Sequence, residues 1–220
     1  KLVVVDGVFS MGGDLAPLPE MIPVCQEYGA RLMVDDAHGM GVMGCGRGTA
    51  AHFGVTDKVD LIMSTFSKSF ASLGGFIAGN EEIVHYIKHF ARSMIFSASI
   101  PPANAAAALV ALEIMEQEPE RVSRVNQIGE YMRKEFSAMG FNIGQSVTPI
   151  VPIIIGDDNL TFAFWKALFE AGVFVNPIIS PAVPQGMQLL RTSYMATHTD
   201  DQLNRVLETF QKVGKQIGVI

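Results

Sequence analysis

The sequence predicts an α/β fold with a mostly parallel sheet, followed by a smaller α+β domain. In the first half, short apolar runs alternate with segments of helical character, which is the pattern of strands separated by helices. Acidic or polar residues follow the first three runs, at the strand ends where ligands bind in open α/β sheets. From about Glu116 the order of elements changes, so we place the domains at residues 1–116 and 117–220.

The first-half elements are each bounded by turn residues. Strands are expected over residues 2–5, 31–34, 61–64 and 75–78. A helix over residues 17–28 has proline in its first turn and Gly29 as its stop. Further helices are expected over residues 81–92 and 103–115. The last is rich in alanine and too short to span a bilayer, which takes about 20 residues, so we expect a buried helix there.

The second half mixes strands and helices in an order that favours an α+β domain. A long amphipathic helix ends at Gly140, and a second helix ends at Gly172. Thr199 or Asp200 is placed to cap the last helix. The helices are expected over residues 119–139, 160–171 and 199–217, and the strands over residues 150–155, 173–176 and 187–194.

Composition narrows the class of protein. The 220 residues can form one large or two modest domains. The 16 basic and 22 acidic residues include no Lys/Arg cluster, so no nucleic-acid partner is expected. Cys25 and Cys45 lack metal-ligand spacing, which favours reduced thiols in a cytoplasmic protein without a bound metal.

Two further expectations concern targeting and the start of the chain. No signal peptide or transmembrane segment is visible, which is compatible with peripheral association with a membrane. The chain enters an apolar strand directly after Lys1, and natural amino termini rarely begin inside a core strand. We therefore expect that an upstream portion is missing.

Lys68 has the most informative surroundings in the chain. It lies in Ser64-Thr65-Phe66-Ser67-Lys68-Ser69-Phe70, between an apolar run and the pair Gly74-Gly75. A lysine that forms a Schiff base needs partial desolvation, which lowers its pKa and frees the amine to attack a carbonyl. The neighbouring hydroxyls can hold a phosphate. A purely structural lysine is the alternative, and the choice depends on the rest of the chain.

Three polar segments follow consecutive predicted strands, at residues 6–14, at Asp35-Asp36-Ala37-His38-Gly39 and at Lys68. Each alone is explained by a loop residue that caps a helix, and His38 by a core histidine. Together, a carboxylate, an imidazole and a lysine suit pyridoxal phosphate (PLP). The carboxylate keeps the pyridine nitrogen protonated, so the ring withdraws electrons from the substrate α-carbon, and a histidine can hydrogen-bond the phenolate oxygen.

These motifs resemble the α-oxoamine synthase family. The similarity is carried by residues 6–18, by residues 34–42 and by Thr65-Phe66-Ser67-Lys68, and it continues through residues 96–99 and 190–199. Members are PLP enzymes of fold type I that condense an amino acid with an acyl-CoA, with loss of CO2 in most cases. The chain matches only the carboxyl-terminal half, without the glycine-rich cofactor loop and the ring-stacking histidine. Gly12 stands where members often have an acidic residue.

The resemblance implies a role for individual residues. Asp35 would pair with the pyridine nitrogen, and His38 with Ser10 would contact the phenolate oxygen. Thr65 would bind the phosphate, and Lys68 would be the Schiff-base lysine. The implied catalytic residues are Lys68, His38 and Asp35.

Two further roles concern the substrate and the partner subunit. Arg191 would bind the substrate carboxylate, with a surface arginine as the alternative. Ser97 and Ser99 resemble a segment that reaches the phosphate of the partner subunit, which implies a homodimer with a shared active site.

The substrate class is suggested by less specific features. Residues 180–186, and Ser67 and Ser69 beside the lysine, resemble a bacterial branch that joins L-serine to a long-chain acyl-CoA, giving 3-ketosphinganine, CO2 and CoA. A proline-rich turn without a role is the alternative for the loop. Other branches use glycine with acetyl-CoA, or alanine with pimeloyl-CoA to give 8-amino-7-oxononanoate. A non-catalytic fragment or scaffold subunit is the rival class, and the isolated 220 residues are expected to be inactive.

Overall fold

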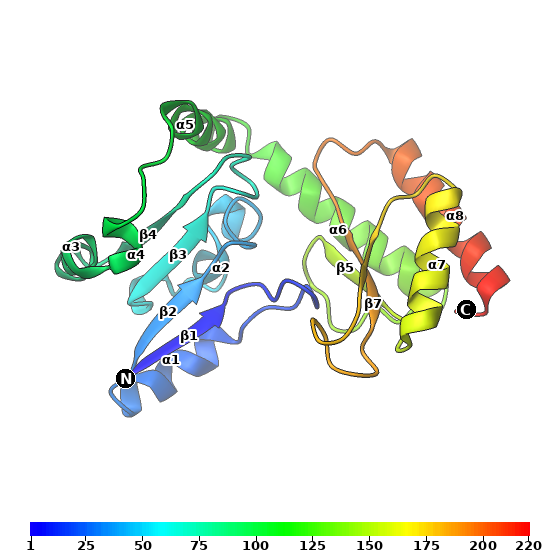
Figure 1. Ribbon diagram of the computed structural model, residues 1–220, viewed down its shortest axis with the longest axis horizontal. Coiled ribbons are helices and arrows are strands. Elements are labelled where there is room, and N and C mark those ends of the chain that lie inside the picture. Colours follow the sequence, from blue (N-terminus) through cyan, green and yellow to red (C-terminus); the bar gives the residue numbers. More distant parts are fainter. The chain divides into compact units, whose positions relative to one another are not determined.

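A computed structural model describes residues 1–220. The chain forms two compact units (Figure 1). The first contains Lys1–Phe9 and Leu15–Ser123, and the second contains Ser10–Asp14 and Arg124–Ile220. The short segment Ser10–Asp14 belongs to the second unit because Val147 N and Thr148 Oγ1 both donate to Gly13 O, at 3.1 and 2.9 Å.

The first unit is built on a four-stranded sheet in the order β1-β2-β3-β4. β1, β2 and β3 are parallel, and β4 is antiparallel to β3. The loop over residues 66–74 is too short for the crossover of about a dozen residues that a parallel pair needs. The prediction of a mostly parallel α/β sheet is confirmed. The strands are β1 (Leu2–Asp6), β2 (Arg31–Asp35), β3 (Leu61–Thr65) and β4 (Gly75–Gly79).

Five helices accompany this sheet. Leu18 and Ile22 of α1 are buried with Leu32 and Val34 of β2, and this cluster is the core of the unit. The sequence suggested one helix over residues 81–92, but the backbone is extended at Ala91 and divides it in two. The helices are α1 (Leu18–Glu27), α2 (Thr49–His52), α3 (Glu81–Phe90), α4 (Arg92–Ile95) and α5 (Pro102–Gln117), with 3-10 turns at Gly44–Gly46 and Thr56–Lys58.

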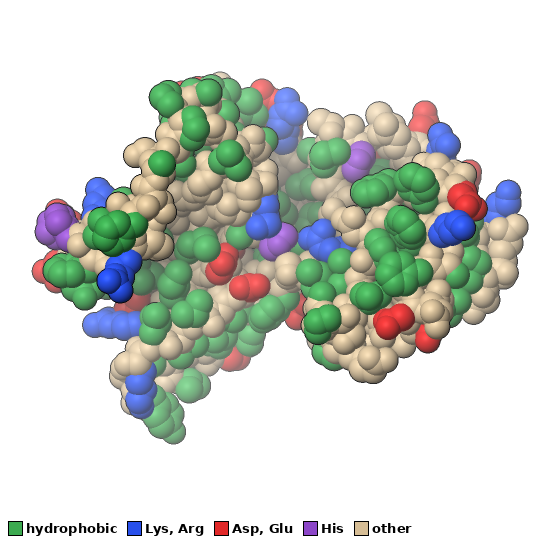
Figure 2. Space-filling view, viewed as in Figure 1, with side chains coloured by type: hydrophobic (Ala, Val, Ile, Leu, Met, Phe, Trp, Pro, Cys, Tyr) green, Lys and Arg blue, Asp and Glu red, His purple; other side chains and the backbone are tan.

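Helix α5 contradicts the prediction of a buried helix. Only Ala108 on it is buried, while Leu109, Val110 and Leu112 are exposed. Figure 2 shows hydrophobic side chains at the surface over α5. Apolar composition predicts that a helix can be buried but does not say which elements cover it. No helix in the structure has both the length and the apolar character to cross a bilayer.

The second unit packs three helices on a small antiparallel sheet in the order β5-β7-β6. Phe136, Phe164 and Phe210, one from each helix, are fully buried at the centre of its core. Thr199 caps the last helix in a capping box with Gln202, as expected. The elements are α6 (Glu120–Ala138), β5 (Ile150–Ile154), α7 (Asp158–Glu170), β6 (Asn176–Ile178), β7 (Leu189–Ser193) and α8 (Asp200–Ile217).

Strand β6 lies later than predicted. Residues 173–176 were expected to form it, but Val173 and Val175 pack into the core and pairing with β7 starts at Asn176. Alternating burial in this segment reflects a loop crossing the core rather than a paired strand.

Asp60 gives the first unit a pH-dependent contact. Its Oδ2 accepts from Leu32 N at 2.8 Å and its Oδ1 from Arg31 Nη1 at 2.7 Å. Desolvation acts to raise the pKa of Asp60, but these hydrogen bonds together lower it below the ordinary 3.8. The unfolded chain therefore binds more protons than the folded chain between the two pKa values. The stabilisation is present above pH 3.8 and is lost as the pH falls through the folded pKa.

Asp60→Asn is expected to reduce the free energy of unfolding by about 1 kcal/mol at pH 7, mainly through the weakened bond to Leu32 N. The exposed ion pair with Arg31 adds little. Urea unfolding followed by circular dichroism should show this loss of unfolding free energy staying constant above pH 3.8 and shrinking as the pH is lowered below 3.8, through the folded pKa of Asp60. Asp57→Asn, in the same loop, is the control and should match wild type. A deficit that is constant with pH would contradict the assignment.

Candidate active site

The carboxyl ends of β1, β2 and β3 gather charged residues at one edge of the first sheet. Asp6 pairs in register with Asp35, and Asp35 with Met63. Burial raises the pKa of Asp6 first, the Asp35 charge raises it further, and the Lys68 charge opposes both. Parallel strands bring their ends to the same edge, so residues far apart in sequence come within electrostatic range. Asp35 and Lys68 thus belong to one charged cluster.

The turn after β2 positions Asp35 and His38. Asp35 is half-buried, and its Oδ1 accepts from Ala37 N at 3.1 Å. His38 is half-buried in the turn over residues 37–39, which Gly39 N and Met40 N close by donating to Asp36 O. These hydrogen bonds fix the backbone that carries the Asp35 carboxylate and the His38 imidazole.

The loop after β3 brings hydroxyl groups together. Thr65 Oγ1 lies 2.8 Å from Ser67 Oγ, accepts from Ser67 N at 3.1 Å and donates to Gly74 O at 3.0 Å. Because the single Thr65 hydrogen is directed at Gly74 O, the Ser67 hydroxyl is the donor in the Thr65–Ser67 bond, and it would have to turn away from Thr65 Oγ1 to donate to an anion. The sequence prediction named Thr65 as the phosphate ligand, and the structure places the Ser67 hydroxyl beside it.

Lys68 itself is exposed. The partial desolvation expected of a Schiff-base lysine is therefore not present in this structure, since no described element covers the amine. The loop that carries it is nevertheless anchored: Ala71 N donates to Lys68 O at 2.9 Å, and Phe66 and Phe70 pack edge to face at 5.2 Å.

Ser97 and Ser99 lie apart from this cluster, on the exposed segment after α4. The Ser97 hydroxyl donates to Ser93 O of the preceding turn. Ile100, which follows, lies against Gly74, where an added β-carbon would come within 2.7 Å of it. The segment therefore passes beside the loop that Thr65 closes, although neither serine contacts Thr65.

Ser10 and Arg191 meet in the second unit. Arg191 Nε donates to Ser10 O at 2.6 Å, across 181 positions of sequence. Burial lowers the pKa of the Arg191 guanidinium, which nevertheless stays charged because arginine is not deprotonated in proteins. The two terminal nitrogens keep the geometry that binds a carboxylate through two parallel hydrogen bonds. Ser10 contributes its carbonyl here, so the segment after β1 positions the arginine.

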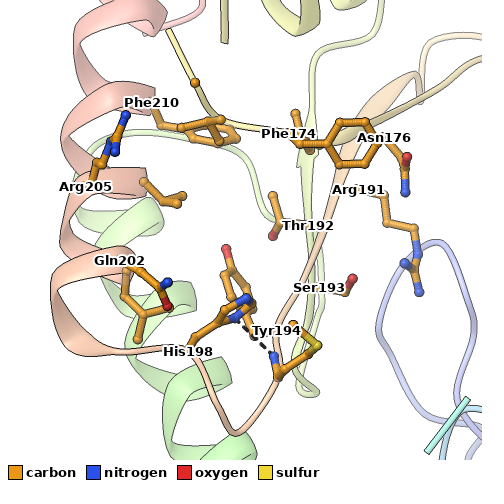
Figure 3. Close-up of a pocket in the computed structure, with 16 residues that line it drawn as sticks. Phe174, Asn176, Arg191, Thr192, Ser193, Tyr194, His198, Gln202, Arg205 and Phe210 are labelled. Atoms are coloured by element: carbon orange, nitrogen blue, oxygen red, sulfur yellow. Dashed lines mark hydrogen bonds between the residues drawn. The ribbon is translucent and has the colours of Figure 1, made fainter. Parts of the chain in front are cut away.

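A cavity of about 540 Å³ opens next to Arg191 between β7 and α8. Figure 3 shows Phe174 and Phe210 at one end of this cavity and His198 and Gln202 at the other, with Tyr194 beside His198. The Tyr194 hydroxyl is buried beside the Thr192 hydroxyl, which donates to Val151 O at 2.7 Å and keeps a lone pair directed at the phenol, but the two hydroxyls do not meet good hydrogen-bond geometry. Burial raises the pKa of this phenol well above its usual range, so it stays protonated.

The comparisons with known proteins agree with this geometry. Serine palmitoyltransferase from Sphingobacterium spiritivorum is 53% identical over 98% of the chain and 54% of its own length. 8-Amino-7-oxononanoate synthase from Thermosipho melanesiensis is 47% identical over 100% of the chain and 56% of its own length. A solved serine palmitoyltransferase with bound PLP aligns with a TM-score of 0.96 at 37% identity, covering 100% of the chain and 56% of its own. The chain spans about half the length of the relatives it matches.

The fold and the charged strand ends define the class of PLP-dependent transferases of fold type I. The chain belongs to the aminotransferase class I and II family, whose pattern it matches over residues 1–210. Its relatives confirm the resemblance to the α-oxoamine synthases.

Proposed function

We propose that the protein carrying this chain condenses an amino acid with an acyl-CoA, with decarboxylation. L-Serine and a long-chain acyl-CoA are the proposed substrates, and 3-ketosphinganine, CO2 and CoA the products. The names of the relatives support this choice, since serine palmitoyltransferases from three genera match at 47–53% identity. The proposed assembly is a homodimer in the cytoplasm, and the 220 residues alone are expected to be inactive.

The cofactor indicated by the family and by the solved relatives is PLP. The single observation that carries the proposal is the clustering of Asp35 and Lys68 at neighbouring strand ends. The donor set fits PLP: a carboxylate for the ring nitrogen, an imidazole at His38 and the Thr65–Ser67 hydroxyl pair for the phosphate. When bound, PLP supplies an electron sink that stabilises negative charge at the substrate α-carbon.

The residues of the chain would supply binding and proton transfer. Asp35 would hold a proton on the ring nitrogen and so maintain the electron demand of the ring. The Lys68 amine would attach the cofactor covalently and, once displaced by substrate, remove and return the proton at the α-carbon. Arg191 would hold the substrate carboxylate until it leaves as CO2.

The acyl preference is proposed to depend on the segment before β7. Pro181 and Ala182 are exposed, while Val183 is buried and Gln188 is fully buried, with its side chain bonded to Gly186 N and Asp158. This arrangement holds one end of the loop and leaves its tip at the surface. Phe174, 74% exposed, lines the cavity, whereas its neighbours Val173 and Val175 belong to the core. Phe174 is thus the residue of that stretch that can meet an acyl chain.

A substrate panel tests the proposal. The full-length protein should release CoA fastest when L-serine is combined with palmitoyl-CoA, compared with pairs drawn from glycine or alanine and acetyl- or pimeloyl-CoA. The second candidate is 8-amino-7-oxononanoate synthesis, because relatives with that name are up to 47% identical. A preference for alanine with pimeloyl-CoA would select it. A preference for glycine with acetyl-CoA would contradict both, and no CoA release from any pair would favour a non-catalytic scaffold.

A further inference from the structure

The strongest unexplained feature of the first unit is the buried carboxylate of Asp36. Its side chain is fully buried, one residue beyond β2 and between two residues of the candidate site, Asp35 and His38. Carboxylates are almost never fully buried unless they are paired. No role has been assigned to Asp36 in the proposed reaction.

Both oxygens of this carboxylate are bound by one residue. Asp36 Oδ1 accepts from Thr49 Oγ1 at 2.6 Å, and Oδ2 accepts from Thr49 N at 2.7 Å. Thr49 begins α2 and is itself fully buried. The pairing therefore fastens the turn after β2 to the first turn of α2, 13 residues further along the chain.

The partner is neutral, so the buried charge is not balanced by a cation. Burial raises the pKa of Asp36 first, the two Thr49 hydrogen bonds lower it, and the neighbouring Asp35 charge raises it again. Buried ionic groups contribute little net stability, and fixing one conformation is their best supported use. The free-energy cost of burying the Asp36 carboxylate is therefore better explained by a role in fixing the geometry of the turn than by a gain in stability.

The backbone of Asp36 connects the same turn to β3. Asp36 N donates to Met63 O at 2.7 Å, and Asp36 O accepts from Ser64 Oγ at 3.3 Å. Asp36 O also accepts from Gly39 N and Met40 N, which close the turn that carries His38. One residue thus links the Asp35 end of β2, the His38 turn and the strand that leads to Lys68.

Glycines surround the carboxylate. A β-carbon added to Gly7, Gly39 or Gly48 would collide with an Asp36 carboxylate oxygen. Gly7 lies in the segment after β1, Gly39 in the turn that carries His38, and Gly48 directly before α2. The backbone of three loops is therefore packed directly against this single side chain, which leaves it one position.

From these contacts we infer that Asp36 and Thr49 form a positioning pair that holds Asp35 and His38 in place for the cofactor. The inference rests on the proposed function, because it names what the held residues would bind. Asp36 does not touch the cofactor in this scheme and acts only through the backbone.

The decisive variant is Thr49→Val, which keeps the backbone donor and removes the hydroxyl donor without a change of shape. Thr49→Ser restores the hydroxyl and is the rescue variant. Thr199→Val, at the cap of α8 in the second unit, also removes a hydroxyl hydrogen bond and is the matched control for lost stability. Asp36→Asn is a second change at the other partner, should Thr49→Val fail to fold.

Two measurements are needed, one of which does not involve the cofactor. Hydrogen exchange followed by mass spectrometry on the cofactor-free full-length protein should show faster exchange over residues 36–49 in Thr49→Val and Asp36→Asn only. In the full-length protein, the dissociation constant for PLP should rise about 10- to 100-fold, the range found for residues behind metal ligands. Thr49→Ser should recover most of both effects, and Thr199→Val should show neither.

The outcomes separate this inference from the proposed function. Unchanged exchange over residues 36–49, or unchanged PLP affinity in a folded Thr49→Val protein, would overturn the inference and leave the proposed function intact. Equal losses in Thr199→Val and Thr49→Val would overturn it too, since the effect would be one of general stability. Failure of the unmutated full-length protein to bind PLP would overturn the proposed function and, with it, the role given to the pair.

Discussion

Lys68→Ala is expected to abolish turnover in the full-length protein, with a loss of at least about 10²–10⁴-fold from proton transfer alone. The loss of covalent attachment adds to this. The fold should be unaffected, because Lys68 is exposed and surface substitutions usually change the free energy of unfolding by less than about 0.5 kcal/mol. The unmutated protein should be yellow, and borohydride reduction followed by peptide mass spectrometry should place the cofactor on Lys68.

Lys58→Ala is the matched control, since Lys58 is an exposed lysine of the same unit in the Thr56–Lys58 turn. It should keep the colour, the turnover and the label on Lys68. A colourless unmutated protein, or a reduced cofactor found on another lysine, would contradict the assignment of Lys68. Thermal unfolding of both variants would show whether any loss comes from the fold.

Arg191→Ala is expected to raise the KM for the amino acid by about 30-fold or more. Removing one partner of a buried, hydrogen-bonded charge pair costs about 2–5 kcal/mol, and the substrate carboxylate would lose its guanidinium. The KM for the acyl-CoA should change much less. The KM of Arg191→Lys for the amino acid should lie between those of the unmutated protein and Arg191→Ala, because an ammonium keeps the charge but not the fork of two parallel donors. Initial rates with each substrate varied in turn measure both constants.

Arg205→Ala is the control for this prediction. Arg205 lines the same cavity from α8 but is exposed, so it should leave the KM for the amino acid unchanged. An amino-acid KM that is unchanged in Arg191→Ala would remove Arg191 from substrate binding. Its bond to Ser10 O would then be its only supported role.

The sequence was most informative where local patterns have a single physical outcome. Short apolar runs bounded by turn residues identified the strands of both sheets except β6, and glycine stops and the Thr199 cap identified helix ends to within a few residues. The motifs around Asp35 and Lys68 also pointed to the family, which the comparisons confirm. The catalytic and binding roles of the individual site residues stay predictions.

Errors arose where the outcome depends on what packs against a segment. Apolar composition suggested a buried α5, but whether a helix is buried depends on neighbours that its own residues do not specify. Val173 and Val175 have strand-forming side chains, but they pack in the core of the second unit and β6 begins later.

By itself, then, the sequence determined most of the element types, the α/β class and the family, and it named the residues predicted to hold PLP. Only the tertiary structure decided that Ser10 O binds Arg191 and that the Asp36 carboxylate is enclosed by Thr49 and glycines of three loops. The physical reason is how far apart along the chain the contacting residues lie. Secondary structure and motifs follow from neighbours along the chain, whereas these contacts require backbone hydrogen bonds that bring distant segments to within 3 Å of one another.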